Sequence, residues 1–393
     1  MSSFQKSLIT RSPFLRSPGP GLPRERGKFP MVKRSSVKGR ADYSPITWEK
    51  FFDEKKDLEI NGNTFRVYIK GDTGPALVLI HGGGFSALSW SLLVASLDEM
   101  VECKVLAVDL RGHGDTFTTN DNELSIDVLA NDVVEVINTS LPENTPVVLI
   151  GHSLGGSIAI HAGHHPNLNS LIGLVIIDVV EGTALGALSS MQNILRGRPQ
   201  SFNSIEEAIR WSVQSGHLKN LDSARISMPG QIKNVVTNKS VITELETGVC
   251  TESPEAPEMN PINPAGVESI SEEEEAQFKP PDKAAGKYTW RIDLRTTETH
   301  WPGWFKGLSK LFLSCQAQKL LLLASLDRLD TDLTVAQMQG KFEIHAFEQS
   351  RGRCGHAVHE DIPEAVAEVL ATYLVRNKFA TSKGNISGPL PCC

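Results

Sequence analysis

The sequence predicts an α/β fold in which a doubly wound, mostly parallel sheet carries helices on both faces. Apolar runs of strand length alternate with longer stretches of helical periodicity, and this alternation is typical of parallel sheets buried on both sides. A hairpin at Asn61-Gly62, with strands over 57–61 and 64–70, precedes the first such run. The other predicted strands are residues 76–80, 104–109, 146–150, 171–178, 319–324 and 342–347, and the clearest helices are residues 126–137 and 363–375.

The alternation of strands and helices is interrupted after Asp178. Residues 185–235 contain amphipathic helical segments and no strand pattern, which predicts a helical cap inserted between two strands. The next segment, residues 236–285, is acidic, and its stretch 244–275 holds ten acidic residues, four prolines and no Lys or Arg. Such a composition buries too little apolar surface to offset its ordering entropy, so we expect this acidic insertion to be disordered.

Two terminal segments are also expected to lie outside the folded core. Residues 1–42 form a basic arm, since the first 40 residues contain ten Lys or Arg and one Glu, and this composition predicts disorder. Residues 379–393 are predicted to be a flexible tail without a lipid anchor. Terminal cysteines can carry prenyl groups, but Cys392-Cys393 does not match a four-residue prenylation box. The predicted core therefore consists of residues 43–184 and 286–378.

Composition limits both the function and the compartment. The 393 residues, 40% of them hydrophobic, supply a sizeable core. The net charge of −7 argues against a nucleic-acid binder, which would carry a basic excess. No apolar run approaches the ~20 residues of a membrane span, and the six cysteines show neither metal-ligand nor disulfide-framework spacing. We expect a soluble protein of a reducing compartment, the cytoplasm, with the nucleus left open.

Gly151-His-Ser-Leu-Gly155 is the motif that points to chemistry. Four apolar residues precede it and a run of small helix-forming residues follows, so Ser153 falls on a tight turn between a strand and a helix. The flanking Gly151 and Gly155 permit the close backbone approach that such a turn requires, and the turn exposes a nucleophilic serine. In this context the sequence predicts a serine hydrolase with Ser153 as nucleophile.

A second strand enters the glycine-rich turn His81-Gly-Gly-Gly84. In such hydrolases the loop at this place supplies one backbone N–H of the oxyanion hole, and the residue after the nucleophile supplies the other. We assign these donors to Gly83 and Leu154. A phosphate-binding loop is the competing interpretation, but no Gly-Lys-Ser/Thr follows.

His356 is the predicted general base, because it lies just beyond the last strand and before the final helix, at the carboxyl edge of the sheet. His359, three positions on, would point elsewhere. The cluster His161, His164 and His165 suggests a metal, but it lies on the helix after the nucleophile without a carboxylate or cysteine partner spaced nearby. We predict surface positions for these three histidines and no metal site.

The acid of the triad stays open at this point. Asp178 ends the strand 171–178 and Asp327 follows the strand 319–324, and either residue keeps the chain order Ser, Asp, His. Spacing along the chain does not choose between them.

The motifs together resemble the α/β-hydrolase superfamily and, more narrowly, the protein phosphatase methylesterases. The similarity covers roughly residues 43 to 378 and includes an acidic insertion in the cap. The residues that carry it are His81-Gly-Gly-Gly84 with Ser86-Ala-Leu-Ser-Trp90, Asp109-Leu-Arg-Gly-His-Gly114, Gly151-His-Ser-Leu-Gly-Gly156, Ile177-Asp-Val-Val-Glu-Gly-Thr183, Arg196-Gly-Arg-Pro199, Tyr288-Thr-Trp-Arg291, Gln337-Met-Gln-Gly-Lys-Phe342 and Cys354-Gly-His-Ala-Val-His-Glu-Asp361.

The resemblance implies an activity, a partner and a triad. The family removes the methyl ester from the carboxy-terminal leucine of the catalytic subunit of protein phosphatase 2A, which would be both substrate and binding partner, and it needs no cofactor or metal. The family pattern implies Asp178 as the acid, with Asp327 as the alternative. One departure is that residues 348–353 lengthen the loop before His356 and could displace it. A general small-ester carboxylesterase and a non-catalytic phosphatase-binding scaffold are the alternative functions.

Overall fold

The computed structural model describes residues 41–248, 286–326, 329–350 and 352–384. The chain divides into two compact units, Met1–Asp42 and Tyr43–Cys393, and the second contains every helix and strand given below. Residues 1–40 of the predicted basic arm, residues 249–285 of the acidic insertion and residues 385–393 of the predicted tail lie outside the described residues.

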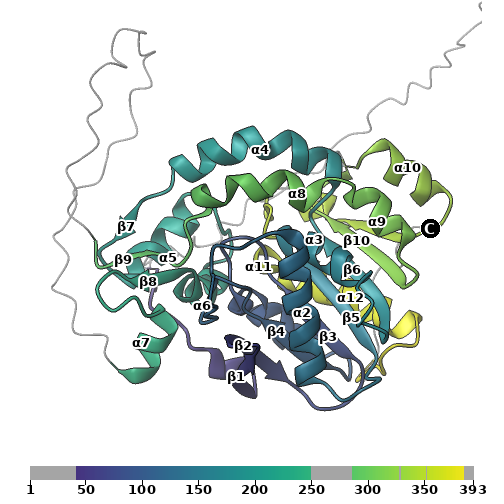
Figure 1. Cartoon of the computed structure of the whole chain (residues 1–393), viewed down its shortest axis with the longest axis horizontal. Helices are drawn as coiled ribbons and strands as arrows, with labels where there is room; N and C mark the ends of the chain where they lie inside the picture. The colour runs from purple at the N-terminus through teal and green to yellow at the C-terminus, as the bar shows by residue number, and fades with distance from the viewer. Residues whose placement is uncertain (1–40, 249–285, 327–328, 351, 385–393) are drawn as a thin grey trace, which may run out of the picture. The chain divides into compact units, whose positions relative to one another are not determined.

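Eight strands of the described residues form one sheet, with the order β1-β2-β4-β3-β5-β6-β10-β11 (Figure 1). β2 pairs antiparallel with β1 and β4, and the strands from β4 to β11 run parallel. The predicted doubly wound, mostly parallel fold is therefore confirmed. The strands are β1 Glu54–Ile60, β2 Asn63–Lys70, β3 Ala76–Ile80, β4 Lys104–Val108, β5 Val147–His152, β6 Leu171–Ile177, β10 Gln318–Leu323 and β11 Glu343–Ala346.

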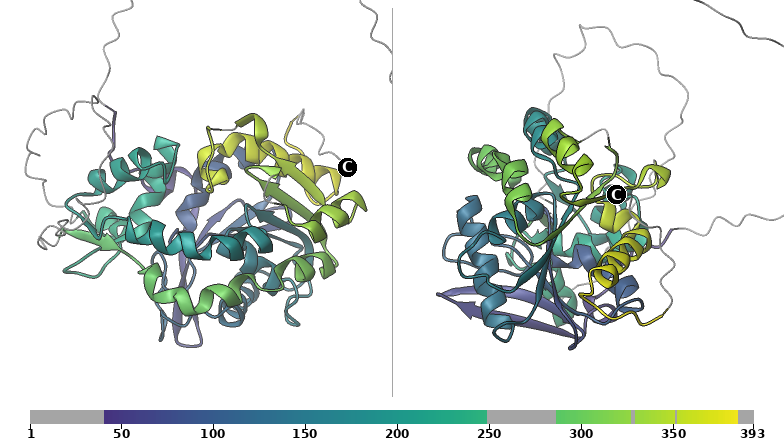
Figure 2. Two further views of the ribbon diagram at one scale, coloured as in Figure 1. Left: turned by 90° about the horizontal axis from the view of Figure 1, so that it is seen from above. Right: turned by 90° about the vertical axis from the view of Figure 1, so that its right-hand side faces the viewer.

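Side chains of the central strands alternate between two separate hydrophobic clusters, one on each face of the sheet. Val78 and Ile80 of β3 belong to one cluster, with α2 (Ile126–Ser140), α3 (Leu154–Ala162) and α9 (Leu308–Ser314). Leu77 and Leu79 belong to the other, with α1 (Ser91–Asp98) and α12 (Pro363–Arg376). This period of two follows from the strand geometry, and Figure 2 shows the helices on both sides of the sheet.

The cap differs from its prediction because it contains strands. Three short strands form a second, antiparallel sheet with the order β7-β9-β8, namely Ser201–Phe202, Tyr288–Trp290 and Ile232–Asn234. Two- and three-residue strands show no usable periodicity, and β9 comes from beyond the acidic insertion, so the pairing leaves no local signal. The cap helices are α4 Glu181–Arg196, α5 Ile205–Gln214 and α6 Leu221–Gln231.

Two further segments are ordered where disorder was expected. α7 (Val241–Thr247) begins inside the predicted acidic insertion, because Ser240 caps it by accepting from the Thr243 N–H, and Val241 and Ile242 are buried. In the predicted tail, Ser382 bridges to Val101, and Lys383 Nζ pairs with Asp98 Oδ1 at 2.9 Å. The other helices are α8 Trp301–Phe305, α10 Thr331–Met338 and α11 Val358–Asp361. In the described parts of the chain, no helix has the length and apolar character needed to cross a membrane.

Candidate active site

Ser153 lies between β5 and α3 in a strained backbone conformation, with φ 52° and ψ −120°. A non-glycine residue rarely adopts this region, which costs roughly 1–3 kcal/mol and is maintained by the packing around it. The packing is very close, because a Cβ at Gly151 would lie 2.1 Å from the Gly155 carbonyl oxygen. A Cβ at Gly155 would lie 2.1 Å from the Ile80 carbonyl oxygen. Glycine is therefore required at both positions, and the turn presents the Ser153 hydroxyl at the edge of the sheet.

His356 bridges Ser153 and Asp178. Its Nε2 lies 2.8 Å from Ser153 Oγ, and its Nδ1 lies 2.8 Å from Asp178 Oδ2. Because the carboxylate can only accept, Nδ1 carries the proton and Nε2 is free to take one from the serine. The longer loop before His356 thus does not displace the ring from Ser153. The three residues reach one edge of the sheet from the ends of β5, β6 and the segment after β11.

Asp178 is buried and held in a left-handed conformation with φ 53°. Its Oδ1 accepts the N–H of Ala324 at 2.9 Å, and its own N–H donates to the Leu322 carbonyl oxygen. These bonds to β10 fix the carboxylate, so that the other oxygen faces His356. The alternative acid, Asp327, lies outside the described residues.

The loop that carries His356 is fixed from two sides. The His152 ring donates from Nε2 to the His356 carbonyl oxygen at 2.9 Å, and burial lowers the pKa of His152 well below its usual value, so the ring is neutral. Asp361 accepts the N–H of Gly355 at 2.6 Å. His359 is also buried and packs against Trp90, with 4.1 Å between ring centroids. These residues support the base without touching the reacting atoms.

Gly83 and Leu154 line the same cavity as Ser153. Among the described residues no backbone carbonyl accepts from the N–H of either residue. The next N–H in the loop, that of Gly84, donates to His113 Nε2 at 2.9 Å, which burial keeps neutral by lowering its pKa to about 4. The loop is thus anchored at Gly84, while the N–H groups of Gly83 and Leu154 stay available for an oxyanion.

The cavity beside Ser153 has a volume of about 780 Å³ and lies between the sheet edge and the cap. Most of its lining is apolar. Its charged lining residues within the described structure are Asp178, which is bonded to His356, and Arg198. The apolar part of the lining comprises Phe85, Leu154, Val179, Val180, Ala184, Ala187, Met191, Ile194, Leu195, Trp211, Leu294, Trp301, Trp304, Phe305 and Ala357.

The predicted histidine cluster lies away from this cavity, and of its three residues His161 alone belongs to α3, which ends at Ala162. His164, just beyond the helix, donates from Nδ1 to the Ile160 carbonyl oxygen, and its Nε2 lies 3.1 Å from Ser314 Oγ. His161 is half-buried, and burial lowers its pKa, which differs from the predicted surface position. In the residues that the structure describes, no group of His, Cys, Asp and Glu is arranged to hold a metal ion.

Sequence reasoning missed the residues of the cap that complete the site. Lys219 donates from its backbone N–H to Asp361 and from Nζ to the Cys354 carbonyl oxygen at 3.0 Å. Arg198 and Trp290 were visible only as parts of motifs shared with the family, without a role. Their contacts join residues that lie about 90 or more positions apart, and such pairs give no periodic signal.

Fold, strained nucleophile and bridging histidine together define a serine hydrolase of the α/β-hydrolase class, and the alpha/beta hydrolase family model matches residues 77–369. The chain also belongs to the protein phosphatase methylesterase family. It is 46% identical over 404 residues to "Protein phosphatase methylesterase 1" of Homo sapiens, and to that of Mus musculus, with 100% of both chains covered. "Probable protein phosphatase methylesterase 1" of Caenorhabditis elegans is 40% identical, covering 91% of this chain and 85% of its own.

Solved structures at low identity support the fold. "E-2-(Acetamidomethylene)succinate Hydrolase" superposes with a TM-score of 0.57 at 17% identity, covering 82% of this chain and 99% of its own. "Thioesterase Domain From Curacin Biosynthetic Pathway" gives 0.53 at 18% identity, covering 81% and 99%. Both similarities apply to the α/β-hydrolase architecture alone.

Proposed function

We propose that the protein is a serine carboxylesterase that demethylates the carboxy-terminal leucine methyl ester of the protein phosphatase 2A catalytic subunit, releasing methanol and the free carboxylate. The observation that carries the proposal is the hydrogen-bonded chain from Ser153 through His356 to Asp178 at the mouth of an apolar cavity. The full-length similarity to protein phosphatase methylesterases supports the choice of substrate.

The reaction follows from the roles of these groups. Ser153 Oγ attacks the ester carbonyl carbon while His356 Nε2 takes its proton, and Asp178 stabilises the resulting imidazolium. The N–H groups of Gly83 and Leu154 stabilise the negative oxygen of the tetrahedral intermediate. His356 returns the proton to the departing methanol and then activates the water that cleaves the acyl-enzyme. This sequence needs no metal or cofactor.

The cavity supplies a reason for a leucyl substrate. Its apolar lining, from Val179 on the sheet side to Met191 and Leu195 on α4, is suited to burying an aliphatic side chain next to the nucleophile. Fully burying a leucine side chain contributes about 1.5–3 kcal/mol, which favours binding but is modest for a specific reaction. We therefore propose that the folded phosphatase also binds the protein, and that α4, α5 and α6 of the cap provide contact surface.

The proposal is tested with carboxymethylated phosphatase catalytic subunit and with a generic aryl acetate as substrates. Ser153→Ala should abolish demethylation while preserving binding of the phosphatase. Ser157→Ala is the matched control, because this buried hydroxyl lies four residues on, in α3, and has no hydrogen-bond partner among the described residues. Demethylation by Ser153→Ala at the wild-type rate would refute the nucleophile.

The same measurement separates the two alternative functions. Activity on the aryl ester without demethylation would indicate a general carboxylesterase. Binding of the phosphatase without activity on either substrate would indicate a scaffold. The scaffold interpretation depended on a displaced His356, and the distance of 2.8 Å between His356 Nε2 and Ser153 Oγ argues against it.

We also propose a cytoplasmic location, with the nucleus as a second compartment. The cysteine spacing of the sequence supports a reducing environment. Imaging of the protein fused to a fluorescent reporter tests this location, and exclusive accumulation in a secretory compartment would contradict it.

A further inference from the structure

The only cationic residue among the cavity-lining residues of the described structure is Arg198, in the segment between α4 and β7. It is half-buried, and within the described residues its guanidinium forms no ion pair with a carboxylate and no hydrogen bond. A desolvated charge without a partner is unfavourable, and folded proteins usually satisfy such groups. The absence of a partner among the described residues therefore suggests that the guanidinium is placed to meet the anion of a ligand.

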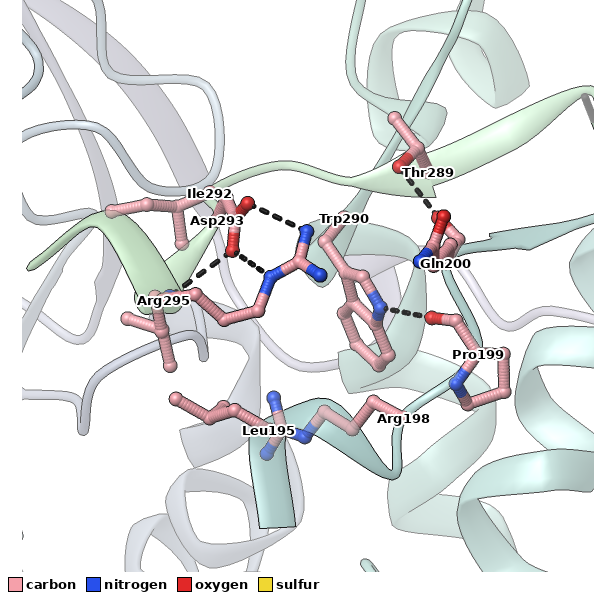
Figure 3. Close-up of a pocket in the computed structure, with 10 residues that line it drawn as sticks. Leu195, Arg198, Pro199, Gln200, Thr289, Trp290, Ile292, Asp293 and Arg295 are labelled. Carbon is pink, nitrogen blue, oxygen red and sulfur yellow. Dashed lines mark hydrogen bonds and ion pairs between the residues drawn. The ribbon is translucent and has the colours of Figure 1, made fainter. Parts of the chain in front are cut away.

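The position of Arg198 is held by the indole ring of Trp290. The guanidinium carbon lies 5.1 Å from the ring centroid, which is a cation–π contact (Figure 3). Trp290 in turn donates from Nε1 to the carbonyl oxygen of Pro199 at 2.7 Å, and Pro199 directly follows Arg198 in the chain. The stacked ring restricts the long arginine side chain and so reduces the entropy lost when a ligand binds.

Arg198 also stays charged at neutral pH, although burial lowers its pKa to about 10. His217, which lines the same cavity, is neutral because burial lowers its pKa to about 3. A cavity with one cationic lining residue matches a singly charged carboxylate better than a dianionic phosphate, which usually binds several donors. The planar fork of the guanidinium can hold both carboxylate oxygens.

Arg198 is close to the predicted oxyanion loop as well. A Cβ built on Gly84 would lie 3.8 Å from Arg198 Nη1, and Gly84 directly follows Gly83. A peptide whose ester carbonyl lies at Ser153 therefore passes through a cavity in which this guanidinium faces it. Asp293, which lines a neighbouring pocket together with Arg198, pairs with Arg295 at 2.8 Å instead.

We propose that Arg198 is a residue of the active-site cavity that binds a carboxylate of the peptide substrate or of its product. The proposal rests on the proposed esterase function, because it assumes that a peptide ester occupies the cavity. Two sources of the carboxylate share this chemistry: an acidic side chain that precedes the leucine ester in the substrate, and the α-carboxylate of the product.

The test uses the full chain and short peptides that end in leucine methyl ester. Glutamate is placed in turn at each of the four positions before the leucine, and each peptide is matched by one with glutamine. For the product, the free-acid and carboxamide forms of the neutral peptide are compared as inhibitors. The wild type should favour the carboxylate form about tenfold in one of these two comparisons, which is the effect of one charge-assisted hydrogen-bonded pair. The difference should appear mainly in KM for the substrates or in Ki for the products.

Arg198→Gln should reduce that preference to less than about twofold, and Arg198→Lys should keep part of it because the charge remains. The matched control is Arg196→Gln, an exposed arginine at the end of α4 that does not line the cavity, and it should retain the preference. Thermal unfolding checks that each variant is folded. If Arg198→Gln does not fold, the carboxylate preference of Arg198→Lys is compared with that of the wild type instead.

An unchanged preference in Arg198→Gln, or no carboxylate preference of the wild type in either arm, would overturn the proposal. Failure of the esterase function is a separate result. If the wild type hydrolyses no leucine methyl ester, the proposed function fails, and binding of the free-acid peptide against the carboxamide peptide then still tests Arg198 directly.

Discussion

The backbone N–H of Lys219, in the cap, donates to Asp361 Oδ1 at 2.7 Å. The other oxygen of Asp361 accepts the N–H of Gly355, next to His356. One carboxylate thus joins the cap to the loop that carries the proposed base, across 142 positions of sequence between Lys219 and Asp361.

Asp361→Asn should therefore reduce kcat, because the amide can accept only with its oxygen and its NH₂ group would face a second N–H donor. A lost hydrogen bond to a charged group costs about 1.5–3 kcal/mol, part of which should appear as misplacement of His356. We expect kcat to fall about tenfold or more. Asp332→Asn, on the exposed side of α10, serves as the control and should leave kcat unchanged. A purely structural role would lower the unfolding temperature without changing kcat of the folded protein.

The choice of acid is tested by a pair of variants. Asp178→Asn keeps the size of the side chain but removes the acceptor that holds the Nδ1–H of His356, and in serine hydrolases such a change lowers kcat by roughly 10⁴. Asp327→Asn should leave kcat within about twofold of the wild type, a margin of less than 1 kcal/mol. Steady-state demethylation rates check both, and loss of activity in the second variant alone would assign the acid to Asp327.

Gly155→Ala should destabilise the protein and abolish activity. The added Cβ would lie 2.1 Å from the Ile80 carbonyl oxygen and 2.5 Å from that of His81, so the backbone would have to move. We expect a loss of several kcal/mol in the free energy of unfolding, in the upper range for a single substitution. Gly186→Ala, on α4, meets no atom within 4 Å and should be neutral or stabilising by up to about 1 kcal/mol. Urea unfolding distinguishes the two.

Glu360 should make stability depend on pH. It is buried, accepts from the Ser223 hydroxyl at 2.7 Å, and burial raises its pKa from 4.5 to about 8. The folded state therefore holds the proton more tightly than the unfolded state. The resulting stability is fully present below pH 4.5 and is lost as the pH rises towards 8, at up to about 1.4 kcal/mol per unit.

Glu360→Gln removes this titration. Because glutamine stays neutral, we expect the variant to become more stable relative to the wild type as the pH rises from 5 to 8. Urea unfolding at several pH values measures that difference. A difference that stays constant over this interval would show that Glu360 does not titrate in the way its burial implies.

The sequence by itself determined the features that depend on local pattern. The strands of the parallel sheet, the helices from Ile126 and Pro363, and the turn at Ser153 all follow from periodicity and from glycines spaced for one tight turn. The family was also accessible from motifs, and the similarity to known methylesterases confirms it.

Tertiary structure decided the features that depend on residues far apart in the chain. The residues alone left Asp178 and Asp327 open, and only the folded chain brings the Asp178 carboxylate to 2.8 Å from His356 Nδ1. The β7-β9-β8 sheet and the stacking of Arg198 on Trp290 join segments on either side of the acidic insertion. Such contacts join residues that lie more than 50 positions apart. They impose no local periodicity, so the sequence pattern alone could not predict them.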